Sequence, residues 1–557
     1  MSTKNARVRI AVAGCLSLTA VVLAQVTAPS VGGAATAAKP VCGGLVADPT
    51  FTEEVPVIGV EHACEHLRGR KQVKGGVPAV DSLSGHHQTS DQVARSAALA
   101  AEDPAVVGSW SAAVNPGTKT VGISAVLLHT GKVLLFGGKY SSTDKNTAAY
   151  LYDPVTKTGH EVPAPAAVFC GSITQLSDGR VLSAGGASPV PKGIVDLWLF
   201  DPVSEEWVRQ PNTPLGRYYP TSTRLADGRI VITAGTPLDG RTANPTVEVY
   251  TPPAGGQAMG TLQVVGPAHV TRFYPRQWLM PDGNMLQVDQ LKSYKLDPAT
   301  WNWTALKSLP SGNGGGSAGL MLPAGPGGSS RVLMIGGLKK GVATASTVRF
   351  DYANAAAGWS LARPMPTARS HMNVVQVPDG SAFAIGGNST QLYNDGQTQT
   401  MKYTPGNDTW TNMATQGVRR AYHSTAVLLP DGRIMSAGDG GPGGGRQQID
   451  YYSPPYLFQG PRPVIGSAPS QVDYGQTFDV ATSGPEVTRA VLMAPAATTH
   501  ANDMNARHVE LAVSPAAGGL TATAPTSARV APPGYYMLFT LTPDGVPSVA
   551  TWVHVGP

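Results

Sequence analysis

Residues 125–138 read AVLLHTGKVLLFGG, two short apolar runs that flank a turn and end on a pair of glycines. The same arrangement returns at 174–186 as TQLSDGRVLSAGG and at 223–235 as TRLADGRIVITAG. A turn residue followed by glycine, set between two apolar runs, is typical of a β-hairpin. Each stretch therefore predicts an antiparallel pair of strands that stops at a glycine.

Four further units follow along the chain. They read WLMPDGNMLQVD, RVLMIGG, VQVPDGSAFAIGG and LLPDGRIMSAG, and end at Asp289, Gly337, Gly387 and Gly438. The ends of successive units lie 48 to 54 residues apart. A period of about 50 residues is that of the kelch blade of a β-propeller. Seven units predict a seven-bladed propeller over residues 104–451, with the segments between hairpins as outer strands. A linear solenoid is the alternative, but it does not require this seven-fold count.

The repeat stops after the tyrosines at 451–452, and a different pattern of short strands begins. Residues 456–557 contain runs such as QTFDVAT at 476–482 and GYYMLFTLT at 534–542. Roughly 100 residues of short strands predict an immunoglobulin-like sandwich. The whole chain is rich in turn residues, with 65 Gly and 47 Pro, and only 14% of it is charged. The fold class is therefore all-β.

The first 38 residues have the pattern of a secretory signal peptide. Lys4, Arg7 and Arg9 precede a mostly apolar run that is followed by small residues. An uncleaved membrane anchor is the alternative, since the apolar run is almost long enough to span a bilayer. We expect a secreted or cell-surface monomer, with association to the cell envelope if the anchor stays. A net charge of +5 without a long basic run gives no sign of nucleic-acid binding.

Three of the four cysteines remain once the signal peptide is removed. Cys42 and Cys64 lie close in sequence in the segment 39–103, and in an oxidising compartment we expect them to form a disulfide. Cys170 takes no part in that disulfide and needs another explanation. A buried cysteine of this kind is most often a small apolar side chain.

Three polar motifs occupy the same place in their repeats, just before the inner hairpin. They are Phe169-Cys170-Gly171, Arg217-Tyr218-Tyr219-Pro220 and Arg420-Ala421-Tyr422-His423-Ser424. Equivalent strand starts of successive blades ring one end of a propeller's central channel, so these side chains are expected to converge there. His500, in a loop between two predicted strands of the sandwich, lies where a loop tip can reach the same channel.

This combination resembles the galactose oxidase and glyoxal oxidase family of copper-radical oxidases. Phe169-Cys170, the Arg-Tyr-Tyr-Pro motif at 217–220, the Tyr422-His423 pair and the sandwich ending APPGYYMLF are similar to the family's motifs. The resemblance covers about residues 104–557. It implies a copper ion held by Tyr219, Tyr422, His423 and His500, and a thioether between Cys170 and Tyr219 that carries a radical.

The resemblance also implies an activity. It is the oxidation of a primary alcohol or a simple aldehyde by O2, with release of H2O2, and Cys170, Tyr219 and Tyr422 as the catalytic residues. Two imidazoles and two phenolates suit tetragonal Cu(II). A flavin or nicotinamide is not required, and the sequence has no GxGxxG between a strand and a helix. The alternative is a non-catalytic kelch propeller that binds a glycan or protein at the cell surface.

Two departures from galactose oxidase affect the substrate site. That enzyme stacks a Trp on the modified tyrosine, but residues 235–238 here read Gly-Thr-Pro-Leu. Trp278 in the next blade is a candidate for this contact, and a core position is the alternative. Phe169 and Arg276 are further candidates for the substrate pocket. The segment 39–103 is too short for the sugar-binding sandwich that galactose oxidase carries at its N-terminus.

Overall fold

A computed structural model describes residues 103–557, with gaps. The gaps are 138–146, 189–191, 239–241, 255–256, 272, 311–312, 324, 326, 340–341, 390–395 and 439–446. The predicted signal peptide and the predicted Cys42–Cys64 disulfide lie outside the described residues. The helical segments within them are α4 (Pro104–Val107) and the short 3-10 turns η1 (Tyr352–Ala357) and η2 (Pro455–Phe458). None of the described helices has the length and apolar character needed to cross a membrane.

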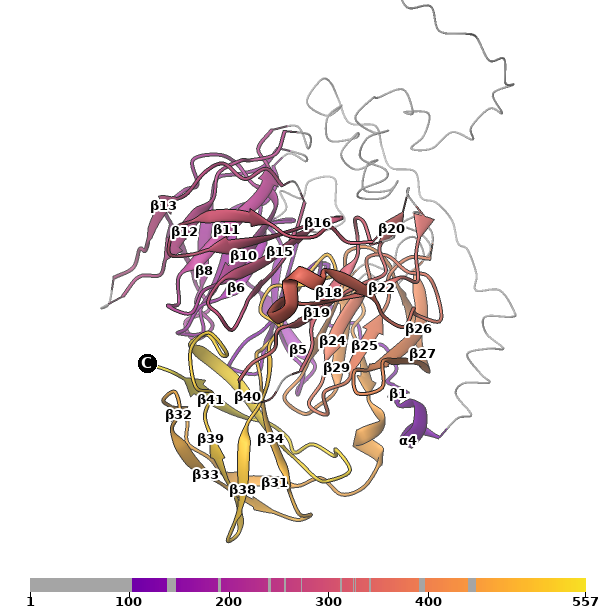
Figure 1. The fold of residues 1–557 in the computed structure, drawn as a ribbon. Helices are drawn as coiled ribbons and strands as arrows, with labels where there is room; N and C mark the ends of the chain where they lie inside the picture. The colour runs from indigo at the N-terminus through magenta and orange to yellow at the C-terminus, as the bar shows by residue number, and fades with distance from the viewer. Residues whose placement is uncertain are drawn as a thin grey trace, which may run out of the picture.

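The described strands up to residue 453 form seven blades of four antiparallel strands each (Figure 1). The inner hairpins of blades 1 to 7 are β2 (Ser124–Leu127) with β3 (Val133–Phe136), β6 (Ser172–Gln175) with β7 (Val181–Ala184), β10 (Tyr218–Arg224) with β11 (Ile230–Thr236), β14 (Arg276–Leu279) with β15 (Met285–Asp289), β18 (Ala318–Met321) with β19 (Arg331–Ile335), β24 (Asn373–Gln376) with β25 (Ala382–Ile385), and β28 (Ser424–Leu428) with β29 (Ile434–Gly438). The predicted seven-bladed propeller is confirmed.

Outer strands complete each blade. They are β4 (Ala149–Asp153), β5 (Thr158–Glu161), β8 (Leu197–Phe200), β9 (Trp207–Gln210), β12 (Glu248–Thr251), β13 (Thr261–Val264), β16 (Lys292–Asp297), β17 (Asn302–Ala305), β22 (Thr347–Asp351), β23 (Trp359–Leu361), β26 (Gln397–Thr404), β27 (Thr409–Arg420) and β30 (Asp450–Ser453). Blade 5 adds the small hairpin β20 (Leu338–Lys339) and β21 (Val342–Ala343). The inner strands are almost fully buried, whereas outer strands such as β5 and β13 are largely exposed.

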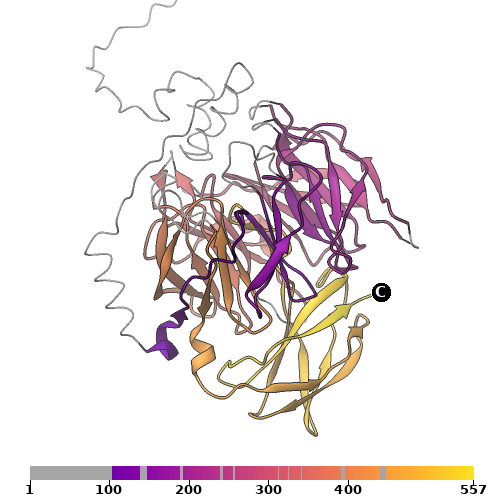
Figure 2. The same cartoon turned by 180° about the vertical axis from the view of Figure 1, so that it is seen from behind.

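The ring is closed by its first strand. β1 (Ser109–Trp110) pairs antiparallel with β30 as the outermost strand of blade 7. Figure 2 shows the indigo start of the described chain against this orange blade. One blade therefore combines the beginning and the end of the repeat, which locks the ring without leaving a long open edge.

The glycines that end the hairpins allow the next blade to approach. A Cβ atom at Gly185 would lie 2.3 Å from the carbonyl oxygen of Arg217, which begins blade 3. At Gly438 it would lie 2.5 Å from the carbonyl oxygens of Gly122 and His423. Both glycines also have φ near +80°, a conformation that favours glycine. At these two hairpins the glycine is thus a packing requirement of the ring.

Buried arginines fasten the start of a blade to its own outer strands. Arg217 bonds the Ala234 carbonyl and pairs with Glu248 on β12, and neither charged side chain is exposed. Arg420 donates to the Gly438 carbonyl at 2.8 Å and to Asp450 at 2.8 Å. Each pair fixes the chain two residues before a predicted site residue, Tyr219 or Tyr422.

The C-terminal part is a sandwich of two sheets. One sheet contains β31 (Val464–Ser467), β33 (Thr477–Ser483), β39 (Gly519–Thr523) and β38 (Ala512–Ala516), and the other β32 (Gln471–Val472), β41 (Thr551–Val555), β40 (Gly534–Leu541), β34 (Arg489–Met493) and β37 (His508–Glu510). Residues of β34 and β40 alternate between the sandwich core and the propeller. Leu492 and Leu538 pack inside the sandwich, whereas Met493 and Phe539 join the apolar cluster of blades 1, 6 and 7.

A hairpin of the sandwich enters the propeller. β35 (Ala497–Thr499) pairs antiparallel with β2, placing Thr499 opposite Ser124, and β36 (Asn502–Asp503) returns beside it. Blade 1 therefore gains two strands from the C-terminal sandwich. His500 lies at the tip of this hairpin.

Removing one partner of a buried ion pair leaves the other charge uncompensated. We expect Glu248→Gln to destabilise the propeller by about 3–5 kcal/mol, because Arg217 stays buried without its counter-charge. The melting temperature measured by scanning calorimetry should fall clearly. The control is Asp227→Asn in the exposed Arg229–Asp227 pair, where about 0–1 kcal/mol is expected. Equal shifts in the two variants would contradict the anchoring role.

Candidate metal centre

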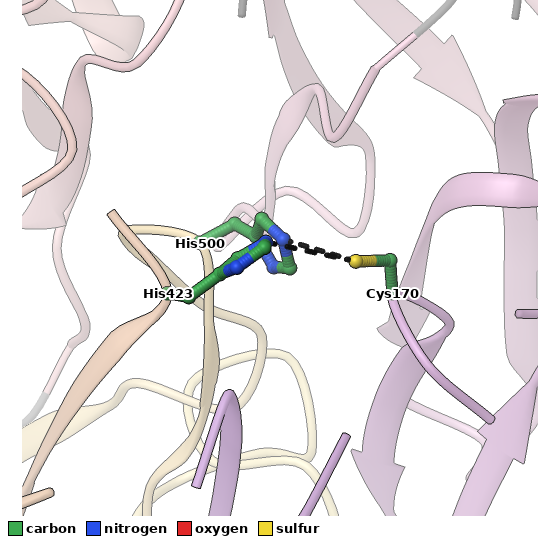
Figure 3. A group of neighbouring side chains, drawn as sticks. All are labelled: Cys170, His423 and His500. Carbon is green, nitrogen blue, oxygen red and sulfur yellow. Dashed lines mark hydrogen bonds between the residues drawn. The ribbon is translucent and has the colours of Figure 1, made fainter. Parts of the chain in front are cut away.

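The site is built from the entry positions of the blades, as the sequence predicted. Cys170 precedes β6, Tyr219 is the second residue of β10, and Tyr422 and His423 precede β28. All four side chains are at most 5% exposed, and His500 is 4% exposed. Figure 3 shows the Cys170 sulfur facing the imidazoles of His423 and His500.

Donor atoms of five residues lie close together. The hydroxyl oxygens of Tyr219 and Tyr422 are 3.0 Å apart. Cys170 Sγ lies 3.2 Å from His500 Nε2 and 3.9 Å from His423 Nε2. The ring centroids of Tyr422 and His500 are 5.1 Å apart, which joins the phenols to the imidazoles. The structure therefore brings together all five residues predicted to form the centre.

The chain of hydrogen bonds around Thr499 fixes the orientation of His500. The Thr499 hydroxyl donates to the Ile123 carbonyl at 3.1 Å and lies 2.6 Å from His500 Nδ1. Because the hydroxyl proton is used on Ile123, Nδ1 carries the imidazole proton and donates to Thr499. Nε2 then presents its lone pair to the centre, which is the tautomer a metal ligand needs.

Left-handed backbone conformations turn these side chains inward. The φ angles of Cys170, Tyr219, His423 and His500 lie between 51° and 68°. Side chains other than glycine rarely adopt such angles, and residues that do so cluster at functional sites. The packed ring of blades holds Cys170, Tyr219 and His423 in this conformation at the blade entries, and the β35–β36 hairpin holds His500.

Aromatic rings enclose Tyr219. Its ring centroid lies 4.2 Å from that of Tyr218, 5.4 Å from Phe273 and 4.9 Å from Tyr274. The Tyr274 hydroxyl donates to the Gly171 carbonyl at 2.9 Å, which ties this ring to the segment of Cys170. Tyr218 thus contacts the ring of Tyr219. In galactose oxidase, a Trp contacts the corresponding tyrosine.

Trp278 lies elsewhere. It belongs to the apolar core between blades 4 and 5 and lines a cavity on the sandwich side. It follows Arg276 by two residues on β14, so the side chains share a face of the strand but stand about 7 Å apart along it. The alternative core position considered for Trp278 is the one observed.

A cavity of about 50 Å³ adjoins the centre on the side of blades 4 to 6. Its lining includes Tyr219, Tyr422, His500, Arg276 and His371. Phe169 packs from the blade 2 side instead, with its ring edge-on to His423 at 5.6 Å. The cavity is the place where a small substrate can meet the proposed ligands.

Arg276 both lines this cavity and holds its walls together. Its guanidinium donates to the carbonyls of Tyr274, Ser317 and His500. Nε is buried without a hydrogen-bond partner. Burial lowers the pKa of Arg276 to about 10, so the group stays cationic at neutral pH. The cavity therefore presents positive charge to a substrate oxygen.

His371 was not predicted from the sequence. Its ring stands edge-on to Tyr422 with centroids 4.7 Å apart, and Nδ1 lies 3.1 Å from Ser370 Oγ. Burial, and next the charge of Arg276, lower the pKa of His371 to about 3, so the imidazole is neutral. Tyr274 and His371 share the blade-entry position and the positive φ of Cys170 and Tyr219. A comparison of the residues at this position in all seven sequence repeats would have identified Tyr274 and His371 as candidates.

The donor set fits a transition metal. Two imidazoles and two phenols offer N and O ligands in a buried space, and His500 already has the required tautomer. The thiol of Cys170 lies within 4.8 Å of both imidazole donors. Fold and site together define a class of proteins, seven-bladed propellers whose axial centre is completed by a hairpin from a C-terminal sandwich.

Comparisons with known proteins identify the family. The glyoxal oxidase N-terminus model matches residues 106–444, and the galactose oxidase-like early set domain model matches 462–555. The chain therefore belongs to the glyoxal oxidase family.

Individual relatives agree with this assignment. The chain is 30% identical over 450 residues to the aldehyde oxidase GLOX of Vitis pseudoreticulata, covering 70% of this chain and 82% of that protein. It is 26% identical over 449 residues to a galactose oxidase of Gibberella zeae, covering 74% and 64%. A solved fungal alcohol oxidase of the AA5 family, in complex with copper, shares the fold. Its TM-score is 0.70 at 23% identity, with 81% of this chain and 100% of that chain covered.

The contact between His371 and blade 5 can be tested at Gly316. A Cβ atom there would lie 2.5 Å from His371 Nε2, and φ is +70°. We expect Gly316→Ala to lower the melting temperature. The matched control is Gly117→Ala, where φ is +80° and no atom lies within 4 Å of the added carbon. Because both variants carry the backbone cost of a positive φ, the excess loss in Gly316→Ala measures the collision with His371. Equal losses would place the imidazole away from Gly316.

Proposed function

We propose that this protein is a copper-radical oxidase that oxidises a primary alcohol or a simple aldehyde with O2 and releases H2O2. The observation that carries the proposal is the convergence of Tyr219, Tyr422, His423 and His500 with Cys170 in one buried group. The aldehyde and galactose oxidases among its relatives support the reaction class. An alcohol and O2 yield an aldehyde and H2O2, so two electrons and two protons move per turnover.

The proposed ligands are the oxygens of Tyr219 and Tyr422 and the imidazoles of His423 and His500. Copper bound there would acidify the substrate hydroxyl and accept one of the two electrons. Thr499 keeps His500 in the ligand tautomer through the 2.6 Å contact with Nδ1. The β35–β2 pairing supplies the rigid support for this fourth ligand.

The second electron requires an oxidisable group in the chain, and we assign it to Tyr219 joined to Cys170. The two residues belong to one buried cluster, and the Tyr219 N–H donates to the Cys170 carbonyl at 3.1 Å. A thioether forms when the sulfur bonds a ring carbon and two hydrogen atoms are removed, with O2 as oxidant. Sulfur substitution makes the phenol easier to oxidise. The surrounding rings of Tyr218 and Tyr274 exclude water from it.

Tyr422 is the proposed base. Its hydroxyl oxygen lies 3.0 Å from that of Tyr219 and borders the cavity, so a substrate hydroxyl entering there reaches it. The Tyr219 radical then takes a hydrogen atom from the substrate carbon. Arg276 and His371 supply a cationic donor and a neutral imidazole for the rest of a small polar substrate.

Further expectations from the sequence remain proposals. We propose cleavage of residues 1–38, a Cys42–Cys64 disulfide and a monomer outside the cell or at its surface. Peptide mapping without reduction tests the disulfide, and the N-terminal residue of the mature protein tests the cleavage. A non-catalytic binding propeller is the second candidate, and it has no use for one tightly held copper ion per chain.

Copper content tests the ligand assignment. We expect His423→Ala and His500→Ala to lose most of the copper affinity, since each removes one of the two nitrogen ligands. Thr499→Val, which leaves both imidazoles but frees His500, should lower affinity by about 10–100-fold. Copper titration followed by metal analysis measures the three variants. His160→Ala, which removes an exposed imidazole paired with Glu205, is the control. Full copper occupancy in both ligand variants would contradict the assignment.

Two variants separate the radical from the base. Tyr422→Phe should still bind copper and form the thioether, but turn over about 10²–10⁴-fold more slowly because the base is lost. Cys170→Ser should bind copper and lose the near-infrared absorption of the radical, because an unmodified phenol is harder to oxidise. Peroxide release is measured across alcohols, aldehydes and sugars, and the thioether by mass spectrometry. If Cys170→Ser kept the absorption and the wild-type rate, a cross-linked radical would not be the catalyst.

A further inference from the structure

A second cavity, of about 30 Å³, lies where the sandwich meets blades 3 and 4. Its walls come from the ends of β10 and β14, the residues after β36, and β40. Two arginines contribute to this lining, Arg224 from the propeller and Arg507 from the sandwich. Burial is the larger cause that lowers the pKa of Arg507, and the two arginines are close enough for the charge of Arg224 to lower it further. This cavity is separate from the one beside Tyr219 and has no part in the proposed oxidation.

The charges of this lining do not balance. Asp503 is the carboxylate among its described residues, against two guanidinium groups. That carboxylate is already bound, since Oδ1 accepts the N–H groups of Ala497 and Asn505 at 3.0 Å each. Burial raises the pKa of Asp503, which weakens it further as a counter-charge. The cavity thus keeps an excess of positive charge.

Hydrogen bonding of the two arginines is also incomplete. Arg224 is 6% exposed, and Nη1 reaches the Gln175 and Leu176 carbonyls only at 3.4 Å. Its Nε is buried without a partner. Both Nη atoms of Arg507 share the Leu279 carbonyl at 3.2 Å.

The neighbouring phenol is a neutral acceptor. Tyr536 donates its proton to the Pro532 carbonyl at 2.8 Å and accepts a hydrogen bond from Arg224 with its oxygen, but it supplies no negative charge. Buried cations with unsatisfied donors are costly unless a counter-ion is present.

We propose that this cavity binds one monovalent anion of the size of chloride between Arg224 and Arg507. Two guanidinium groups against one carboxylate leave one positive charge, which a single monovalent anion would balance, and the cavity has room for an ion of this size. The anion would accept from both guanidinium groups, one on each side of the domain interface. Because Asp503 ends the hairpin that carries His500 and Arg507 follows it, the ion would fasten the sandwich to the propeller beside that hairpin.

Crystallography of the whole protein in bromide gives the direct test. The protein is purified and crystallised throughout in bromide with chloride omitted, so that bromide is the halide available to the site. We expect an anomalous peak between the two guanidinium groups. A cavity that holds only water under these conditions would overturn the proposal.

Thermal stability gives an independent test. At constant ionic strength, replacing gluconate by bromide or chloride should raise the melting temperature by on the order of 2 °C, because a ligand of the folded state stabilises it. Arg224→Gln removes one of the two guanidinium groups and with it the excess positive charge of the lining. This variant should lose the halide effect and be no less stable than the wild type in gluconate.

Arg229→Gln, an exposed arginine of the next turn, is the control and should keep the halide effect. If Arg224→Gln were destabilised equally in both salts, Arg224 would serve only through its carbonyl contacts, and the anion site would be rejected.

Discussion

The rest of the structure depends on one contact, the antiparallel pairing of β35 with β2. It makes a hairpin of the sandwich into part of blade 1 and carries His500 to the residues that the propeller gathers at its axis. The sandwich has no freedom to lean away, because β34 and β40 are apolar on both faces and bury one of them against blades 1, 6 and 7. The centre shared by the two domains therefore rests on strand pairing and apolar packing that continue across their interface.

The propeller contributes its side chains through a shared geometry. At the entry of the inner hairpins the chain takes a left-handed turn, at Cys170, Tyr219, Tyr274, His371 and His423. Buried arginines and the close approach at the hairpin glycines hold these positions. Conformational strain at such sites is sustained only where the surroundings are well packed. The core of each blade is therefore what keeps the donor atoms in place.

Much of this could be read from the sequence, because the hairpins repeat with turn chemistry that is local. The convergence of Cys170, Tyr219, Tyr422 and His423 followed from their common offset in the repeat. The same offset applies to Tyr274 and His371, but neither belongs to a motif that resembles the family's, so they were missed. Trp278 was considered for the Tyr219 contact because the sequence predicts the strand that carries it. The sequence does not show how far along that strand, relative to Tyr219, the indole lies. The arginine pair at 224 and 507 joins distant segments, and no periodicity reports it.

The order of the residues along the chain determines when during synthesis the metal centre can be completed. Ring closure waits for β30 to meet β1, more than 300 residues after β1 is made, and the last imidazole comes from residue 500. A partly synthesised chain can therefore assemble individual blades while its donor set is still incomplete. If the metal is captured only by the full set, loading is confined to the finished chain, after export where the chain is secreted. The blades can thus form before the reactive centre receives its metal.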